Sequence, residues 1–109
     1  TDAKIAWEIS YEAPGLVNDD KFTDLIINSA KNGLGKDNVI LMEESSMGGE
    51  DFAYYLQKIP GCFFFVGSAP NENELFETPH HCSHFNMDEE ALLIGPSIYL
   101  NLIDDIMGI

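Results

Sequence analysis

The chain has 109 residues, a hydrophobic fraction of 45% and a formal net charge of −14 at pH 7. This length fits one domain or a piece of one, and the apolar content argues against a disordered chain. The negative charge argues against binding to nucleic acid or to an anionic membrane, since both need basic patches. We find no signal peptide and no apolar stretch near the roughly 18–20 residues of a membrane span, so we expect a cytoplasmic protein.

The first predicted element is a half-exposed strand over residues 3–11, in which apolar and polar side chains alternate. The chain then breaks at Pro14, and Asn18 is the expected N-cap of a helix. This helix should end at Gly33 and Gly35.

The second half of the chain alternates apolar runs with helical patterns. Residues 39–42 predict a short strand, and a polar loop separates it from a helix over residues 52–59. Residues 62–66 are all apolar, which suits a strand buried on both faces. A last helix should run over residues 88–106 with Pro96 inside it, and its apolar composition predicts that it is well buried.

This order of elements predicts an α/β fold, in which helices pack on a mainly parallel sheet. The strand over residues 3–11 differs from the others, because its apolar and polar residues alternate and a Pro-Gly break separates it from the rest of the chain. It resembles the edge of a neighbouring sheet. A lone strand of this kind is not stable in water, which indicates a fragment of a larger protein or pairing between chains.

All three histidines lie in one stretch, His80-His81-Cys82-Ser83-His84. Imidazole and thiolate are common ligands of zinc and similar metals. A catalytic zinc needs three protein ligands, and hydrolysis needs a general base as well. Adjacent residues of an extended loop point to opposite sides, so we do not expect this stretch to form a complete site alone. Cys62 opens an apolar run and is expected to be a core thiol.

Three motifs follow one another along the chain. Residues 47–53 are Met-Gly-Gly-Glu-Asp-Phe-Ala, residues 60–67 are Pro-Gly-Cys-Phe-Phe-Phe-Val-Gly, and residues 81–92 are His-Cys-Ser-His-Phe-Asn-Met-Asp-Glu-Glu-Ala-Leu. In this order and spacing they resemble the carboxyl-terminal part of the zinc-dependent amidohydrolases, which include aminoacylases, hippurate hydrolases and indole-acetyl-amino-acid hydrolases. The resemblance covers nearly the whole chain.

The resemblance implies two divalent metal ions, zinc or alternatively manganese, cobalt or nickel. It makes His81 a metal ligand, since the family has a His-x-Pro-x-Phe loop and His81 stands four residues before Phe85. Ser83 stands where the family has proline. His80 and His84 gain no role. The family's general base and its other ligands have no counterpart here, so no catalytic residue is assigned and the chain alone is expected to be inactive.

Met47, Gly48 and Gly49 are candidate substrate-pocket residues. They precede a helix start, where exposed backbone N–H groups could receive a substrate carboxylate. The alternative is that Glu50 and Asp51 already satisfy this helix start and serve only as its cap.

The resemblance also implies a domain organisation. Residues 1–13 would be the last strand of a lid domain that mediates dimerisation, and residues 14–109 would be the carboxyl-terminal part of the catalytic domain. The parent would be a homodimer that cleaves the amide bond of N-acyl amino acids or similar small molecules. The alternatives are a small acidic, non-catalytic metal-binding or interaction module and a stand-alone domain whose histidines have no role.

Overall fold

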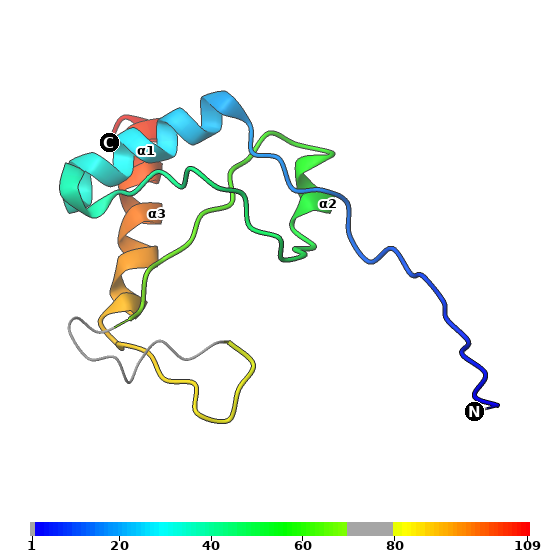
Figure 1. The fold of residues 1–109 in the computed structure, drawn as a ribbon. Coiled ribbons are helices and arrows are strands. Elements are labelled where there is room, and N and C mark those ends of the chain that lie inside the picture. Colours follow the sequence, from blue (N-terminus) through cyan, green and yellow to red (C-terminus); the bar gives the residue numbers. More distant parts are fainter. Residues whose placement is uncertain (1, 70–79) are drawn as a thin grey trace.

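The computed structural model describes residues 2–69 and 80–109. Its helices are α1 (Asp20–Leu34), the 3-10 turn η1 (Lys36–Asn38), α2 (Ala53–Leu56) and α3 (Ala91–Met107). The Cα radius of gyration is 18.3 Å, whereas a compact domain of this length has about 13 Å. Figure 1 shows one reason: the amino-terminal segment leaves the helices and extends as an arm.

Helix α1 begins and ends with local side-chain and backbone caps. The Asp19 side chain accepts a hydrogen bond from the Phe22 N–H at 2.9 Å, which makes Asp19 and not Asn18 the N-cap. Gly35 ends the helix with a φ of 86°, a conformation that glycine adopts without strain. The predicted helix is therefore confirmed, with a start one residue later than expected.

The described core lies where α1 packs against α3 (Figure 1). The buried side chains of these two helices are Ile26, Ser29 and Ala30 of α1 and Ala91, Ile98 and Leu102 of α3, and Ala53 of α2 is buried as well. Pro96 lies inside α3 as predicted. The expectation that α3 is well buried is wrong, because Leu93 is 74% exposed and Leu100 64% exposed.

Residues 62–66 run between α2 and α3, and their aromatic rings alternate between the two helices. The Phe63 ring lies 5.8 Å from the Phe52 ring, which precedes α2. The Phe64 ring lies 5.9 Å from the Tyr99 ring of α3. This alternation is the period of an extended chain. Full burial on both faces is not observed, since Phe65 is 63% exposed.

The prediction of an α/β fold on a mainly parallel sheet is wrong, because none of the described residues forms a strand. A strand exists only where a second backbone completes its hydrogen bonds. Among the described residues, no backbone hydrogen bond joins the three predicted strands at residues 3–11, 39–42 and 62–66 to one another. Residues 3–11 are exposed, and Leu41 and Met42 are exposed as well, so these apolar patterns mark neither paired nor buried strands in the described chain.

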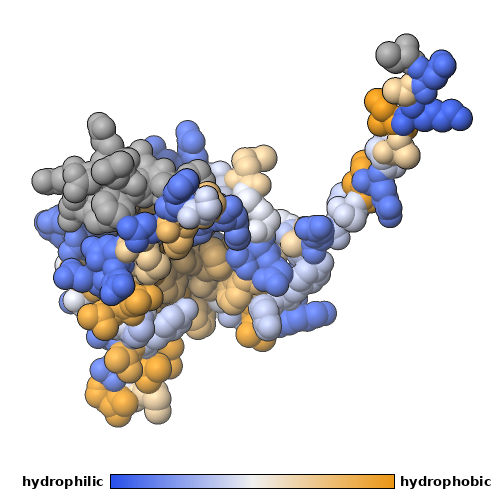
Figure 2. Space-filling model, turned by 90° about the horizontal axis from the view of Figure 1, so that it is seen from below, coloured by the Kyte–Doolittle hydropathy of each residue, from blue (hydrophilic) through white to orange (hydrophobic). Residues whose placement is uncertain are grey.

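Apolar side chains remain open to solvent over much of the surface. Figure 2 shows them on the projecting arm and on the body of the molecule. On the arm Ile5 is 88% exposed, and Ile40 in the segment after η1 is 84% exposed. Among residues 2–69 and 80–109, no helix is long and apolar enough to cross a membrane.

Candidate functional site

The histidine loop is a turn that presents His81 to solvent. His81 has a φ of 63°, and among the described residues it is the one non-glycine residue with a positive φ. The Phe85 N–H donates to the Cys82 carbonyl at 3.2 Å and closes the turn. The His81 side chain is exposed, and no hydrogen bond to its ring comes from the described residues. Its donor nitrogens are therefore accessible.

The neighbouring donors do not join His81 in a complete metal site. Within the part of the chain that the structure describes, no three His, Cys, Asp or Glu side chains come close enough to hold one ion. The His80 and His81 ring centroids lie 6.4 Å apart. An exposed imidazole such as that of His81 can serve as one ligand of a divalent ion whose other ligands come from elsewhere.

The second predicted loop lies before α2. Met47 is 98% exposed, Gly48 and Gly49 are exposed, and the Gly48 N–H donates to Ser46 Oγ at 3.2 Å. Glu50 accepts a hydrogen bond from the Phe52 N–H at 3.1 Å through its carboxylate. This carboxylate contact lies just before α2, whose N-cap Phe52 makes no side-chain cap hydrogen bond. No hydrogen bond of the described residues joins this loop to His81.

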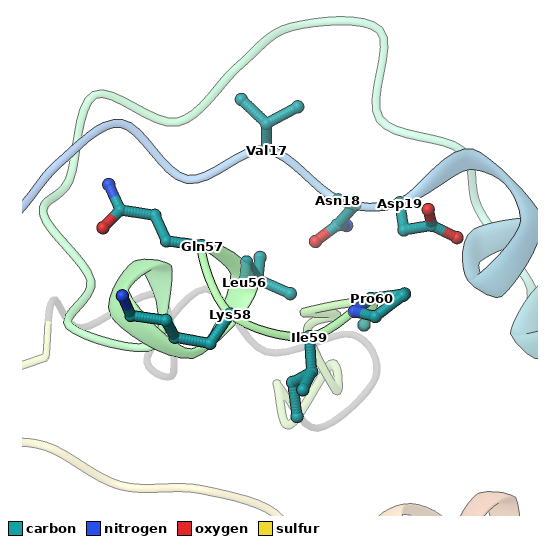
Figure 3. Close-up of a pocket in the computed structure, with 9 residues that line it drawn as sticks. Val17, Asn18, Asp19, Leu56, Gln57, Lys58, Ile59 and Pro60 are labelled. Carbon is teal, nitrogen blue, oxygen red and sulfur yellow. The ribbon is translucent and has the colours of Figure 1, made fainter.

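An open cavity of about 380 Å³ lies elsewhere, between the end of the arm and the carboxyl end of α2. Figure 3 shows its lining side chains, which come from Val17, Asn18, Asp19 and the segment from Leu56 to Gly61. Neither His81 nor the loop at residues 47–49 contributes to it. The cavity is thus separate from both predicted site segments.

A contact that the sequence does not predict fixes the start of α1. Asn18 Nδ2 donates to the Phe63 carbonyl and Asn18 Oδ1 accepts from the Phe63 N–H, both at 2.8 Å. The Asp19 N–H donates to the Gly61 carbonyl at 2.9 Å. The Asn18 amide thereby makes the pair of hydrogen bonds to Phe63 that the backbone of a neighbouring strand would make. An asparagine between an extended segment and a helix is expected to be the N-cap of that helix. The sequence therefore gives no signal that Asn18 binds the Phe63 backbone.

A second link joins the arm to α2. The Tyr54 hydroxyl donates to the Glu12 carbonyl at 3.0 Å. The Asp88 N–H similarly donates to the Ser68 carbonyl at 2.8 Å and ties the end of the histidine loop to the segment that follows residues 62–66. These contacts place the three sequence motifs on one continuous framework.

Comparison with known proteins assigns this framework to a family. The model of peptidase family M20/M25/M40 matches residues 2–105. The chain belongs to this family. The resemblance seen in the three motifs is therefore confirmed, and relatives of the chain include proteins named as hydrolases.

Three relatives illustrate the range of the family. The chain is 41% identical to a putative amidohydrolase, YhaA, of Bacillus subtilis over 85% of its own length and 24% of that protein. It is 35% identical to IAA-amino acid hydrolase ILR1-like 4 of Arabidopsis thaliana over 82% of its length and 20% of that protein. It is also 35% identical to thermostable carboxypeptidase 1 of Saccharolobus solfataricus, over 75% and 20%.

The chain thus spans about a fifth to a quarter of the length of the curated relatives that it matches. No solved structure matches it. The division of the chain at residue 13 into lid and catalytic parts stays a prediction.

Proposed function

We propose that this chain is the carboxyl-terminal part of a metal-dependent amidohydrolase, and that the complete protein cleaves the amide bond of N-acyl amino acids or similar small compounds. The observation that carries the proposal is the family match over residues 2–105, which includes the loop that presents His81. Relatives named amidohydrolase and IAA-amino acid hydrolase support the amide as the bond cleaved.

His81 would hold one of two divalent ions. Its side chain is exposed, and a neutral imidazole is a common ligand for zinc and its alternatives manganese, cobalt and nickel. When bound, such ions supply Lewis-acid polarisation of the scissile carbonyl. Donors beyond those of the described residues would complete the coordination sphere. The chain alone is therefore expected to bind zinc weakly and to be inactive.

Substrate contact is proposed for the loop at Met47, Gly48 and Gly49. Its residues are exposed before α2, and backbone N–H groups of this kind bind carboxylates where no side chain already occupies them. The Glu50 carboxylate accepts from the Phe52 N–H and Ser46 Oγ accepts from the Gly48 N–H, which leaves the Gly49 N–H as the available donor of the two glycines. The lid role of residues 1–13, dimerisation through that lid and a cytoplasmic location belong to the same proposal.

A non-catalytic metal-binding module is less well supported. It would need a self-contained site, and the described residues bring no three donor side chains together. Zinc bound tightly and stoichiometrically by the isolated 109-residue chain would favour that module over the amidohydrolase.

The test is an amidase assay on the complete gene product. N-acetyl amino acids, hippurate and an indole-acetyl amino acid are offered to the zinc-loaded protein, and the released amino acid is measured. We expect turnover of at least one substrate by the native protein, loss of turnover in His81→Ala and retention in His84→Ala, which removes a neighbouring exposed imidazole. Full turnover by His81→Ala, or turnover of none of these amides, would contradict the proposal.

A further inference from the structure

The backbone of His81 is held in a conformation that its side chain disfavours. At a φ of 63° it lies in the left-handed region, where the Cβ of any residue other than glycine crowds the following carbonyl. A residue stays in this region only when its surroundings hold it there, and such residues cluster at functional sites.

Two contacts close the loop around His81, and both involve Phe85. The Phe85 ring meets the His80 ring at a centroid distance of 5.2 Å and an interplanar angle of 70°, an edge-to-face arrangement. The Phe85 N–H also donates to the Cys82 carbonyl at 3.2 Å. His80 and Phe85 stand on opposite sides of His81 in the sequence, so their ring contact fixes both ends of the segment.

The histidine loop is also anchored at its far end. The Asp88 N–H donates to the Ser68 carbonyl at 2.8 Å, and Asp88 Oδ1 accepts from the Glu90 N–H at 2.9 Å just before α3. The backbone just after Phe85 is therefore anchored by these hydrogen bonds. His84, in contrast, is exposed and makes no ring contact with the described residues.

We propose that His80 and Phe85 are positioning residues, whose ring contact holds His81 in its left-handed conformation and presents its imidazole for metal binding. This inference rests on the proposed function, because it takes His81 as the ligand. His80 acts in it through its ring and not through a nitrogen donor.

The test measures zinc affinity in the complete protein by competition with a chromophoric chelator. His80→Ala and Phe85→Leu remove the ring contact and should raise the zinc Kd by about 10-fold to 100-fold, the usual cost of losing a group that orients a metal ligand. His80→Phe and Phe85→Tyr keep two facing rings and should stay near the native Kd. His84→Ala is the matched control and should also stay near it.

The other possible results distinguish a failure of the proposed function from a failure of the positioning role. If His81→Ala binds zinc as the native protein does, the proposed function fails together with this inference. If His81→Ala loses one zinc while His80→Ala and Phe85→Leu bind normally, only the positioning role is refuted. If His80→Phe binds as weakly as His80→Ala, His80 acts through its nitrogen, and the inference is wrong. The melting temperature of each metal-free variant separates these effects from a general loss of stability.

Discussion

Removing the Asn18 side chain should release the segment at Phe63 from the start of α1. Asn18 makes two hydrogen bonds to the Phe63 backbone, each 2.8 Å long and partly buried. A typical intramolecular hydrogen bond contributes about 1 kcal/mol net, so Asn18→Ala should cost about 2 kcal/mol locally. Since about 1.4 kcal/mol is a factor of ten, the equilibrium for local opening should rise about 30-fold.

Hydrogen exchange reports this local opening directly, because an amide exchanges when its segment opens. We would compare the exchange of a peptide that contains Phe63 in the complete protein and in Asn18→Ala by mass spectrometry. Asn28→Ala is the control, since Asn28 is an exposed asparagine of α1 without a hydrogen bond of its side chain to the described residues. Unchanged exchange at Phe63 in Asn18→Ala, or equal acceleration in Asn28→Ala, would refute the reasoning.

Three further substitutions test the helix packing and one local hydrogen bond. Ser29 is fully buried and its hydroxyl lacks a partner among the described residues, so Ser29→Ala should raise the free energy of unfolding in urea by about 1 kcal/mol; a loss would contradict this. A Cβ at Gly33 would overlap the Asn101 amide, so Gly33→Ala should gain about 1 kcal/mol in an Asn101→Ala background and less in the native one; equal gains would show no clash. Glu50→Ala removes the acceptor of the Phe52 N–H and should speed exchange there by a local cost of about 1 kcal/mol, whereas Glu50→Gln keeps an acceptor and should not; equal exchange in both variants would show that this hydrogen bond does not protect the Phe52 amide.

The helices were predictable because their signals are local. Gly35 ends α1 where a glycine after the last apolar position predicts it. The apolar spacing found α3, which runs over Ala91–Met107 with Pro96 inside. The helix predicted over residues 52–59 is shorter than expected, since α2 covers Ala53–Leu56. Turn hydrogen bonds nevertheless continue beyond α2, where the Ile59 N–H donates to the Tyr55 carbonyl at 3.0 Å.

The sheet was not predictable because a strand depends on residues far away in the chain. An apolar run such as residues 62–66 indicates burial between layers, and the structure does place it between α2 and α3. The pattern carries no information on whether a partner backbone is present. In the described chain the partner of Phe63 is the Asn18 side chain, which no periodicity predicts.

The position of the candidate site follows from a family motif and stays a prediction, whereas the geometry of its loop could not be predicted. The spacing from Phe85 selects His81 through the family motif, and family membership is confirmed. The left-handed backbone of His81 has no signal in the sequence, because glycine or asparagine would be expected at such a φ. The ring contact between His80 and Phe85 likewise appears only once the turn is formed.

A crystal structure of the complete protein grown with zinc would test the central claim most directly. We expect a ring nitrogen of His81 at about 2.0–2.1 Å from a zinc ion, the usual length of a zinc–imidazole bond. Zinc ions whose coordination is complete without His81, with that imidazole turned to solvent, would contradict the account.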